Sequence, residues 1–371
     1  MRTSFTVSIT VSITVSILCF SVSAALAEDP LVVVAAGRAG TVHFFDAELA
    51  PMGTIGVNPL LESVSASPDG RRLYIAQESQ MKPGSCCGLF SLDLETKKMC
   101  FLTEPSLYGA ASPDGRFLFT QGARGVEVFN ATTLLRLQRM KGPGAYNLQP
   151  SPDGRWLLGV TNSPQPSVDV FDLKGGAMVR QVPIPFGPAT GAWAGNRFYV
   201  FNYGIDGEPA NGWLWSVNPE SSSLPPAKPV ALPDLHGWCN QPVLLMLAGA
   251  ADRLFLAEAF GFKVDRRLAC PDAARGGVFV IQPSTGRVVH IAESVHVYRM
   301  AVSPDGRDLY VLQSTGPSPL NGVRLLHIDT RTGRTLFSTG LGLGEWSLAL
   351  AHIPPGLMPR GHVRATVGCS R

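Results

Sequence analysis

The chain has 371 residues, a formal net charge of +3, and 45% hydrophobic against 16% charged residues. Together with 39 glycines and 30 prolines, this composition is typical of a turn-rich globular β protein and excludes a disordered or membrane chain. The small net charge and the lack of a lysine or arginine cluster argue against nucleic acid or an anionic membrane as a partner.

The first 27 residues have the pattern of a secretory signal. Arg2 supplies the positive start, residues 7–24 the apolar region, and Ala25-Leu26-Ala27 a small-residue cleavage motif. A transmembrane anchor is the alternative, but serines and threonines interrupt the stretch and no basic residue flanks its end. We therefore expect residues 1–27 to be cleaved on export, which leaves a periplasmic chain without a membrane segment.

One pentapeptide, Ser-Pro-Asp-Gly-Arg, occurs four times, beginning at Ser67, Ser112, Ser151 and Ser303. Proline presets φ for a type I turn, aspartate can bond nearby backbone, and glycine accepts a positive φ. Each copy therefore predicts a tight turn between two antiparallel strands, and a second hairpin follows it. Four-stranded antiparallel units that recur every 40–50 residues or so are typical of propeller blades.

Two further units lack the intact pentapeptide but keep its position between two strand-like runs. Gly195-Asn196 and Ala251-Asp252 replace the turn in these units. With the four intact units and one formed by the chain ends, the count reaches seven. The predicted propeller occupies residues 28–356, and residues 357–371 form a C-terminal tail.

The two ends of the propeller region are each incomplete. The N-terminal part supplies only three expected strands, at residues 31–36, 41–46 and 52–57, and the last expected strand, at 347–353, has none after it. Joining them completes one blade and hides the sheet edges that an open array would expose. The sequence therefore predicts an all-β, seven-bladed propeller closed by N- and C-terminal strands that share a blade.

The longest insertions are expected on one face of this propeller. Connections after the second strand of a unit and between units return to the same side, and the long ones lie at 77–87, 203–211, 260–276 and 314–321. Long loops on a rigid scaffold often carry binding function, although insertions also tolerate length at low cost. The candidate residues of this face are Arg38, Tyr203, Asp206, Trp213, Phe260, Phe262 and Asp265. The simpler interpretation is solvated charge for the two aspartates and core packing for Trp213.

Cleavage of the signal would remove Cys19 and leave six cysteines, an even number that favours disulfides over metal ligation in an exported chain. The disulfide candidates are Cys86, Cys87, Cys100, Cys239, Cys270 and Cys369. Cys239 and Cys270 fall on the long-loop face of the sixth unit, where geometry permits a pair. Hairpin registry would place Cys100 opposite Ser91, so a bridge between Cys86 and Cys87 and a link to Cys369 both stay open.

The sequence holds no nucleophile elbow, zinc-binding helix motif, phosphate-binding loop or dinucleotide fingerprint. Its seven histidines are scattered, and His43, His290, His327 and His352 fall within predicted strands, where structural roles are expected. We therefore predict no catalytic residue, no metal and no cofactor on this chain.

Two segments resemble the heavy, β-propeller subunit of bacterial methylamine and aromatic amine dehydrogenases, within the broader class of YVTN-type repeat propellers. The first is carried by Val126-Glu127-Val128-Phe129, Thr133-Leu134-Leu135, Pro152-Asp153-Gly154, Leu157-Leu158, Ser163-Pro164, Pro166, Val168, Val170, Asp172-Leu173, Gly175, Ala177 and Arg180. The second is carried by Leu309-Tyr310, Ser314-Thr315-Gly316, His327, Asp329, Gly333, Leu341-Gly342 and Gly344. Turn and strand residues dominate the match, which covers about residues 110–353.

In that family the propeller is not the catalyst. A tryptophan tryptophylquinone on a separate light chain forms a Schiff base with a primary amine, and the electrons leave to a small blue copper protein. The heavy chain docks the light chain and helps to wall the substrate channel. The resemblance thus implies a non-catalytic subunit of a periplasmic oxidoreductase.

A second interpretation is a stand-alone exported propeller that binds a ligand or a protein partner without catalysis. A self-contained propeller enzyme is the third. It would need carboxylates or histidines at the axial channel, and the segments between units supply few of them.

Overall fold

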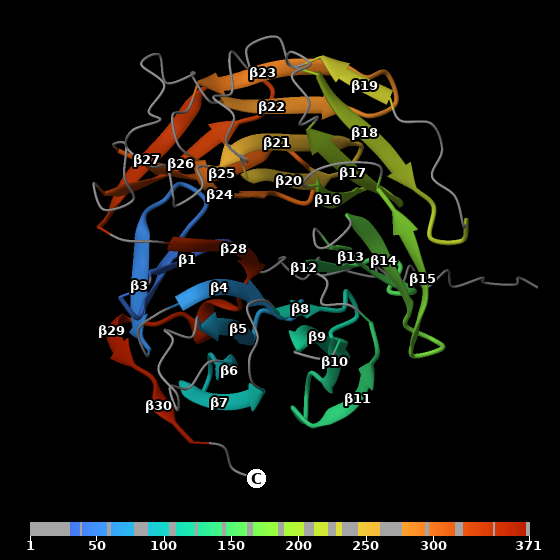
Figure 1. Cartoon of the computed structure of the whole chain (residues 1–371). Helices are drawn as coiled ribbons and strands as arrows, with labels where there is room; N and C mark the ends of the chain where they lie inside the picture. Colours follow the sequence, from blue (N-terminus) through green and yellow to red (C-terminus); the bar gives the residue numbers. More distant parts are fainter. Residues whose placement is uncertain are drawn as a thin grey trace, which may run out of the picture.

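The computed structural model describes residues 30–37, 39–57, 61–77, 88–103, 109–122, 125–142, 146–161, 166–184, 189–203, 211–221, 228–231, 244–259, 277–293, 297–315, 322–343 and 346–368. In this part of the chain, seven antiparallel blades surround a central axis, as the sequence predicts (Figure 1). The expected signal at 1–27 lies outside the described residues. Within the ranges given, no helix has the length and apolar character needed to cross a membrane.

Blade 1 takes its strands from both ends of the propeller region. It consists of β28 (Trp346–His352), β1 (Leu31–Gly37), β2 (Thr41–Phe45) and β3 (Pro51–Gly56). β1 and β28 pair antiparallel from Leu31 opposite His352 to Gly37 opposite Trp346. The predicted closure of the ring by the two chain ends is confirmed.

The other six blades follow in chain order, each as a four-stranded meander from the axis to the rim. Blade 2 contains β4 (Leu61–Ala66), β5 (Arg72–Gln77), β6 (Leu89–Asp93) and β7 (Lys98–Thr103), and blade 3 contains β8 (Gly109–Ala111), β9 (Phe117–Gly122), β10 (Gly125–Asn130) and β11 (Arg136–Met140). Blade 4 contains β12 (Tyr146–Pro150), β13 (Trp156–Thr161), β14 (Ser167–Asp172) and β15 (Ala177–Pro183), and blade 5 contains β16 (Ala189–Ala194), β17 (Arg197–Tyr203), β18 (Asn211–Val217) and β19 (Lys228–Ala231). Blade 6 contains β20 (Leu244–Ala250), β21 (Arg253–Ala259), β22 (Gly277–Gln282) and β23 (Arg287–Glu293), and blade 7 contains β24 (Val297–Val302), β25 (Asp308–Ser314), β26 (Val323–Asp329) and β27 (Thr335–Gly342).

The four Ser-Pro-Asp-Gly-Arg copies form the same turn between the first and second strands of blades 2, 3, 4 and 7. The turn glycines have φ of 65°, 69°, 68° and 70°, and each donates its N–H to the serine carbonyl at 2.8–2.9 Å. Each aspartate accepts the N–H of the arginine two residues later at 3.0–3.1 Å. The predicted roles of aspartate and glycine in this turn are therefore confirmed.

The serine closes the same turn with its side chain. Its hydroxyl donates to the turn aspartate at 2.5–2.7 Å and accepts the N–H of the residue five positions later at 2.9 Å. This second bond ties the end of the first strand to the start of the next.

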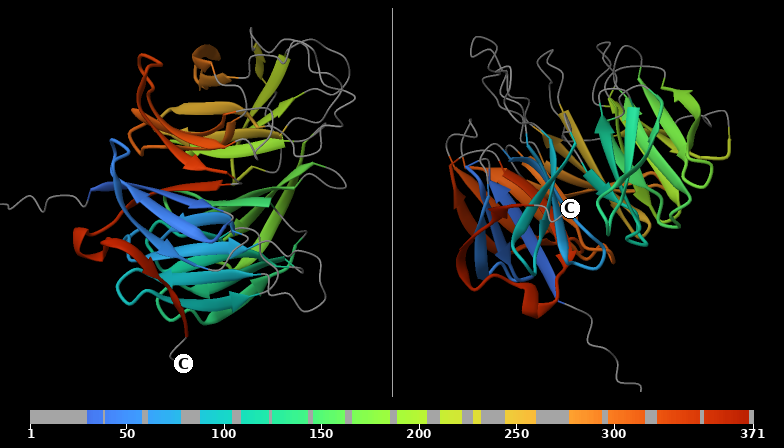
Figure 2. Two further views of the ribbon diagram at one scale, coloured as in Figure 1. Left: turned by 90° about the vertical axis from the view of Figure 1, so that its left-hand side faces the viewer. Right: turned by 90° about the horizontal axis from the view of Figure 1, so that it is seen from below.

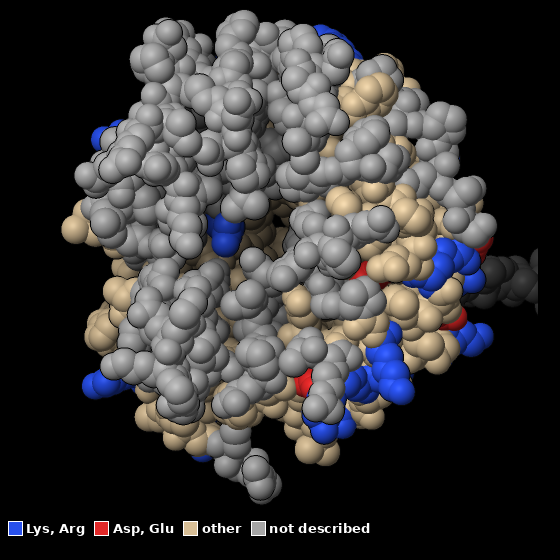
Figure 3. Space-filling view, viewed as in Figure 1, with Lys and Arg blue, Asp and Glu red and all other residues tan. Residues whose placement is uncertain are grey.

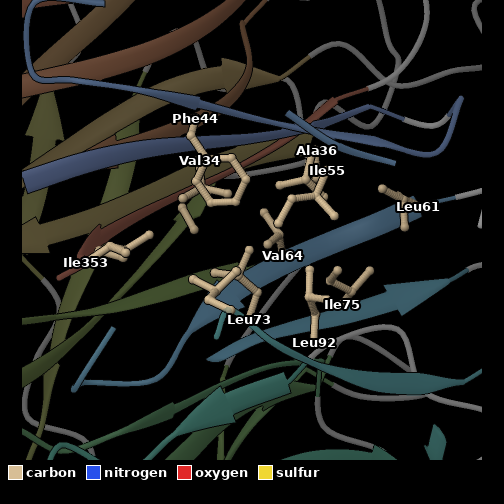
Figure 4. Packing of buried hydrophobic residues seen from close by; sticks show 14 of the residues in the cluster. Val34, Ala36, Phe44, Ile55, Leu61, Val64, Leu73, Ile75, Leu92 and Ile353 are labelled. Atoms are coloured by element: carbon tan, nitrogen blue, oxygen red, sulfur yellow. The ribbon is translucent and has the colours of Figure 1, made fainter. Parts of the chain in front are cut away.

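The core of the described residues is divided into seven apolar clusters, one between each pair of adjacent blades. In β1, for example, Val32 and Val34 pack toward blade 2, whereas Val33 and Ala35 pack toward blade 7. Because side chains alternate along a strand and both faces of a blade are covered, β1 is apolar along its whole length. Figure 4 shows the cluster between blades 1 and 2, where Val34, Phe44 and Ile55 face Leu73 and Ile75.

The C-terminal tail contributes two strands that the sequence analysis did not predict. After a short 3-10 helix, η3 (Pro355–Leu357), β29 (Gly361–Arg364) pairs parallel with β3 at the rim of blade 1. β30 (Thr366–Val367) then pairs parallel with β7 at the rim of blade 2. The chain passes so close to Gly53 that a Cβ atom there would lie 2.1 Å from the Pro359 carbonyl oxygen.

Two physical features hid these strands from sequence reasoning. Both are short and largely exposed, so they lack the alternation that identifies a half-buried strand. Both also add in parallel to a distant edge, for which no turn signal exists. The rim strand β19 was overlooked for a related reason, since its sequence Lys-Pro-Val-Ala contains a proline.

Candidate docking face

One face of the disc collects the ends of the second strands, because every blade has the same antiparallel order. Among the strands that end there are β5 at Gln77, β17 at Tyr203, β21 at Ala259 and β25 at Ser314. The side views of Figure 2 show the strands running between the two faces of the disc. The geometry thus gathers the positions of the long insertions at one face of a rigid ring.

Of the seven candidate residues for this face, Tyr203 and Trp213 belong to the described part of the chain. Arg38, Asp206, Phe260, Phe262 and Asp265 lie outside the described residues, and for Tyr203 only its place at the end of β17 is described. Trp213 lies on β18 opposite Asn202. Its side chain is half-buried against the apolar cluster between blades 4 and 5, beside the buried Trp215.

The inner strands are connected around the axis by side chains. Gln149 on β12 donates its Nε2 to the carbonyl of Gly191 on β16 at 2.7 Å, and Trp193 on β16 returns a bond from Nε1 to the Gln149 carbonyl at 3.2 Å. Ser65 on β4 donates to the Gly109 carbonyl on β8 at 2.8 Å. These bonds satisfy polar groups on inner strands and fix neighbouring blades relative to one another.

A buried carboxylate joins blades 2 and 3. Glu127 on β10 is 1% exposed, accepts a 2.6 Å hydrogen bond from Thr103 and pairs with Arg139 and Arg136 on β11. Burial alone would raise the pKa of Glu127, but the bonds from Thr103 and Arg139 and the two arginine charges outweigh it and lower that pKa. Glu127 is therefore held as an anion.

At the equivalent position in blade 4, the pKa of the acid shifts in the opposite direction. Asp169 on β14 is fully buried and accepts bonds from Thr161 at 2.9 Å, Gln181 at 3.0 Å and Ser167 at 3.4 Å. These donors are uncharged, so burial prevails and raises the pKa of Asp169. The two acids occupy matching places in Val-Glu-Val-Phe and Val-Asp-Val-Phe, but Glu127 has two arginine partners whereas Asp169 has uncharged donors.

These two acids were absent from the predicted site residues. The available signal was an acidic residue within an otherwise apolar strand run, since buried acids are rare unless paired or hydrogen-bonded. Their roles are structural as far as the described residues show, because each is enclosed by groups of the blades themselves.

Three strand histidines also have structural surroundings. His327 Nε2 lies 2.7 Å from Asp308 Oδ1, and its ring stacks between Tyr310 and Phe337. His290 stacks on Phe279, with ring centroids 4.9 Å apart, and His43 stacks on Phe45. In the described ranges, no group of three or more histidine, cysteine, aspartate or glutamate residues could hold a metal ion.

Basic side chains gather on the rim of blade 3. Figure 3 shows lysine and arginine over β11 and beside β15, on the side of the disc that Figure 1 displays. Arg136 and Arg139 lie on β11, and their side chains are 55% and 38% exposed even though they pair with Glu127.

Of the six disulfide candidates, only Cys100 is described. It lies on β7 opposite Ser91, as hairpin registry predicts, and its Sγ is 3.9 Å from the carbonyl oxygen of Gly368. Cys86, Cys87, Cys239, Cys270 and Cys369 lie outside the described residues.

Comparison with known proteins supports the fold but shows no family. No family model and no curated protein matches the sequence. Hydrazine synthase of Kuenenia stuttgartiensis matches with a TM-score of 0.55 and 17% identity, over 72% of this chain and 76% of that one. The dihydro-heme d1 dehydrogenase NirN, solved in complex with DHE, matches with a TM-score of 0.54 and 14% identity, over 88% of this chain and 76% of that one. At such identities the likeness shows a shared propeller fold, and both of these neighbours are redox-related propeller enzymes.

Proposed function

We propose that this chain is the non-catalytic propeller subunit of a periplasmic redox complex, similar to the heavy subunit of an amine dehydrogenase. In this role it docks a small light chain that carries tryptophan tryptophylquinone and oxidises a primary amine. A small blue copper protein then accepts the electrons. The quinone chemistry belongs to the light chain, and this chain supplies a rigid surface.

One coincidence carries the proposal. Residues 126–180, one of the two segments that resemble heavy subunits, include the rim strand β11 and the first part of the rim strand β15. The same rim exposes large apolar side chains, namely Leu135 at 67%, Leu137 at 53% and Val179 at 46%. Exposed apolar side chains rimmed by polar residues are typical of protein interaction sites.

The rims of blades 3 and 4 also lie against each other. A Cβ atom on Gly176, in the turn before β15, would meet the amide of Gln138 on β11 at 2.8 Å. Leu135 lies just before β11 and Leu137 lies on it, and both side chains are exposed. Together with Arg136 and Arg139 they give this rim an apolar centre with basic neighbours, which suits an acidic light chain.

Both structural neighbours add support of a general kind. Hydrazine synthase and NirN are redox-related propeller enzymes, which makes a redox setting for this fold a reasonable expectation. The substrate amine and the partner chains are proposals that rest on the family resemblance.

Affinity purification of the full-length chain from a periplasmic extract tests this function. The tagged protein is expressed with its neighbouring genes, and the eluate is examined for a small quinone-positive chain by redox-cycling stain and for amine-dependent dye reduction. We expect Leu137→Glu to abolish recovery of this chain. Leu336→Glu, on the rim of blade 7 where Leu336 is 46% exposed, is the matched control and should retain it.

Two results would contradict the proposal. An eluate without a quinone-bearing chain and without amine-dependent activity would exclude the amine dehydrogenase role. It would favour the stand-alone propeller that binds a ligand or a protein. Equal loss of the light chain from both variants would show that the rim of blades 3 and 4 is not the specific docking site.

A further inference from the structure

The outer strands of the blades differ in how their exposed edges are protected. An unpaired strand edge is a template for pairing with another chain, and proteins block it with charged residues, proline or a covering segment. In blades 1 and 2, the tail strands β29 and β30 cover the outer strands β3 and β7. The outer strands of blades 3 to 6 each contain a lysine or an arginine, and β15 and β19 also contain proline.

β27, the outer strand of blade 7, has none of these protections. Its sequence Thr-Leu-Phe-Ser-Thr-Gly-Leu-Gly holds no charged residue and no proline, and its 8 residues make it the longest strand in the described part of the chain. Within that part it pairs with β26 and ends the sheet at the rim (Figure 1). Leu336 and Phe337 on this strand are 46% and 39% exposed. The edge of β27 is therefore open to an added strand.

The middle of β27 has the geometry that strand addition needs. Residues 337–340 pair with residues 324–327 of β26 in unbroken register, between two β-bulges. A Cβ atom on Gly340 or Gly342 would meet nothing within 4 Å. Glycine within a strand often marks the close approach of another backbone, as it does at Gly53 of β3, beside which the tail runs.

Basic side chains lie around this uncharged edge. Arg334 immediately precedes β27, Arg331 lies in the turn before it, and both are exposed. Arg324 on β26 is also exposed and lies opposite Gly340, so no side chain at that register position separates it from the edge. The open edge thus has an uncharged strand with positive charge beside it.

The carboxylates of the neighbouring strands are engaged within the blade. Asp308 Oδ1 lies 2.7 Å from His327 Nε2, and Asp329 Oδ1 accepts the N–H of Arg331 at 2.8 Å. A second copy of this chain would bring its own arginines to the same edge, so like charges oppose self-pairing. An acidic segment would instead meet charges of opposite sign. Charge complementarity therefore selects an acidic partner over a second copy.

We propose that β27 binds an extended, acidic segment of a partner protein, which adds to blade 7 as an outer strand. Backbone hydrogen bonds to residues 337–340 provide the affinity, and carboxylates of the segment pair with Arg324 and Arg334. In blades 1 and 2, the chain's own tail occupies the corresponding place. The site is separate from the rim of blades 3 and 4 and does not depend on the function proposed above.

A designed peptide tests this site on the full-length exported protein. The probe alternates threonine and valine, carries aspartates at both ends and bears a fluorescent label. One control probe has lysines in place of the aspartates, and another keeps the aspartates but has N-methylated backbone amides, so it cannot pair as a strand. We expect only the first probe to bind with saturable fluorescence anisotropy and to slow hydrogen exchange in residues 335–343. Equal binding of the N-methylated probe, or protection confined to other segments, would overturn strand addition.

Variants separate this site from general attraction to a basic protein. Arg324→Gln and Arg334→Gln should each weaken binding of the acidic probe about two- to fivefold at low ionic strength. Arg287→Gln, at an exposed position on the rim strand β23, is the matched control and should leave the affinity unchanged, as should Leu137→Glu. Equal weakening by Arg287→Gln would overturn the proposal. Protection of β27 that grows with protein concentration in the absence of probe would also overturn it, because the occupant would then be a second copy.

Discussion

At the scale of single residues, the serine of the repeated pentapeptide joins two strands through one hydroxyl group. Ser151 is 1% exposed, donates to Asp153 at 2.5 Å and accepts the Trp156 N–H at 2.9 Å. The same bond from Ser151 is the first cause of the lowered pKa of Asp153. A surface turn is in this way tied to the buried edge of a blade.

Replacing this serine should weaken the whole domain. We expect Ser151→Ala to lower the free energy of unfolding by about 1–3 kcal/mol, because the buried Trp156 N–H is left without its acceptor. Urea unfolding followed by circular dichroism measures the change. Ser338→Ala on the exposed strand β27 is the control and should stay within about 0.5 kcal/mol of wild type. A Ser151→Ala protein as stable as this control would show that the hydroxyl does not hold the turn.

The buried acids Glu127 of blade 3 and Asp169 of blade 4 give a second prediction at this scale. Since the pKa of Glu127 is lowered in the fold, its contribution to stability is complete above the unfolded value, about 4.3, and is lost as the pH falls through the folded pKa. Glu127→Gln should therefore cost about 1–3 kcal/mol at pH 7, and less in acid, where the wild type also loses the charge. Urea midpoints measured from pH 7 to pH 3 test this.

Asp169→Asn should show the reverse dependence on pH. The pKa of Asp169 is raised, so the folded wild type gains stability as the pH falls through that value toward the unfolded pKa of about 3.9. The asparagine variant cannot gain in this way, so its deficit relative to wild type should grow in acid. Parallel pH profiles for the Glu127 and Asp169 variants would contradict the assigned surroundings.

At the scale of elements, the tail strand β29 brings two histidines together. Thr54 on β3 lies opposite both His43 on β2 and His362 on β29, and its hydroxyl is 2.9 Å from His362 Nδ1. Burial and the nearby His362 lower the pKa of His43. The neutral form of His43 is therefore the one that the folded blade prefers.

Acid should loosen this edge of blade 1. A group with a lowered pKa contributes fully above its unfolded value, about 6.5 for histidine, and that contribution disappears as the pH falls below it. We expect the urea midpoint of wild type to fall between pH 8 and pH 5. His362→Gln, which removes the second charge, should fall less, and equal slopes for the two proteins would exclude this pair as the cause.

The elements also differ in how well the sequence predicts them. The seven blades were predictable because Ser-Pro-Asp-Gly-Arg marks four turns and apolar runs mark the strands beside them, as in β13 and β25. β29 and β30 were not, since they lie exposed on distant edges and resemble loops in sequence. For the docking face, the candidate loops were assigned to one side of the disc from the predicted strand order alone. Trp213 packs against the cluster between blades 4 and 5, which agrees with the simpler interpretation of core packing.

At the scale of the whole molecule, stability depends on closing the ring. β28 pairs with β1, and Ala349, Ala351 and Ile353 complete the cluster between blades 1 and 2. The tail strands lie outside this core and cover two rim edges. Loss of β28 should therefore reduce the stability of the domain more than loss of β29 and β30.

Two truncations separate these contributions. A chain that ends at residue 360 loses β29 and β30 but keeps β28, and we expect a single cooperative unfolding transition with a reduced midpoint. A chain that ends at residue 343 also loses β28, which leaves β1 as an open edge, and it should lose cooperativity or fail to fold. Unfolding curves from circular dichroism and tryptophan fluorescence should coincide for the first chain only. Similar curves for both chains would contradict the role assigned to β28.

The position of β28 in the chain has a consequence for biosynthesis. The other three strands of its blade, β1, β2 and β3, are made first, and all the other blades are made before β28 follows. A nascent chain thus carries an unfinished first blade throughout elongation and can seal the disc only near its end. Any premature stop before Trp346 would release a product with a bare strand edge, which is a template for aggregation.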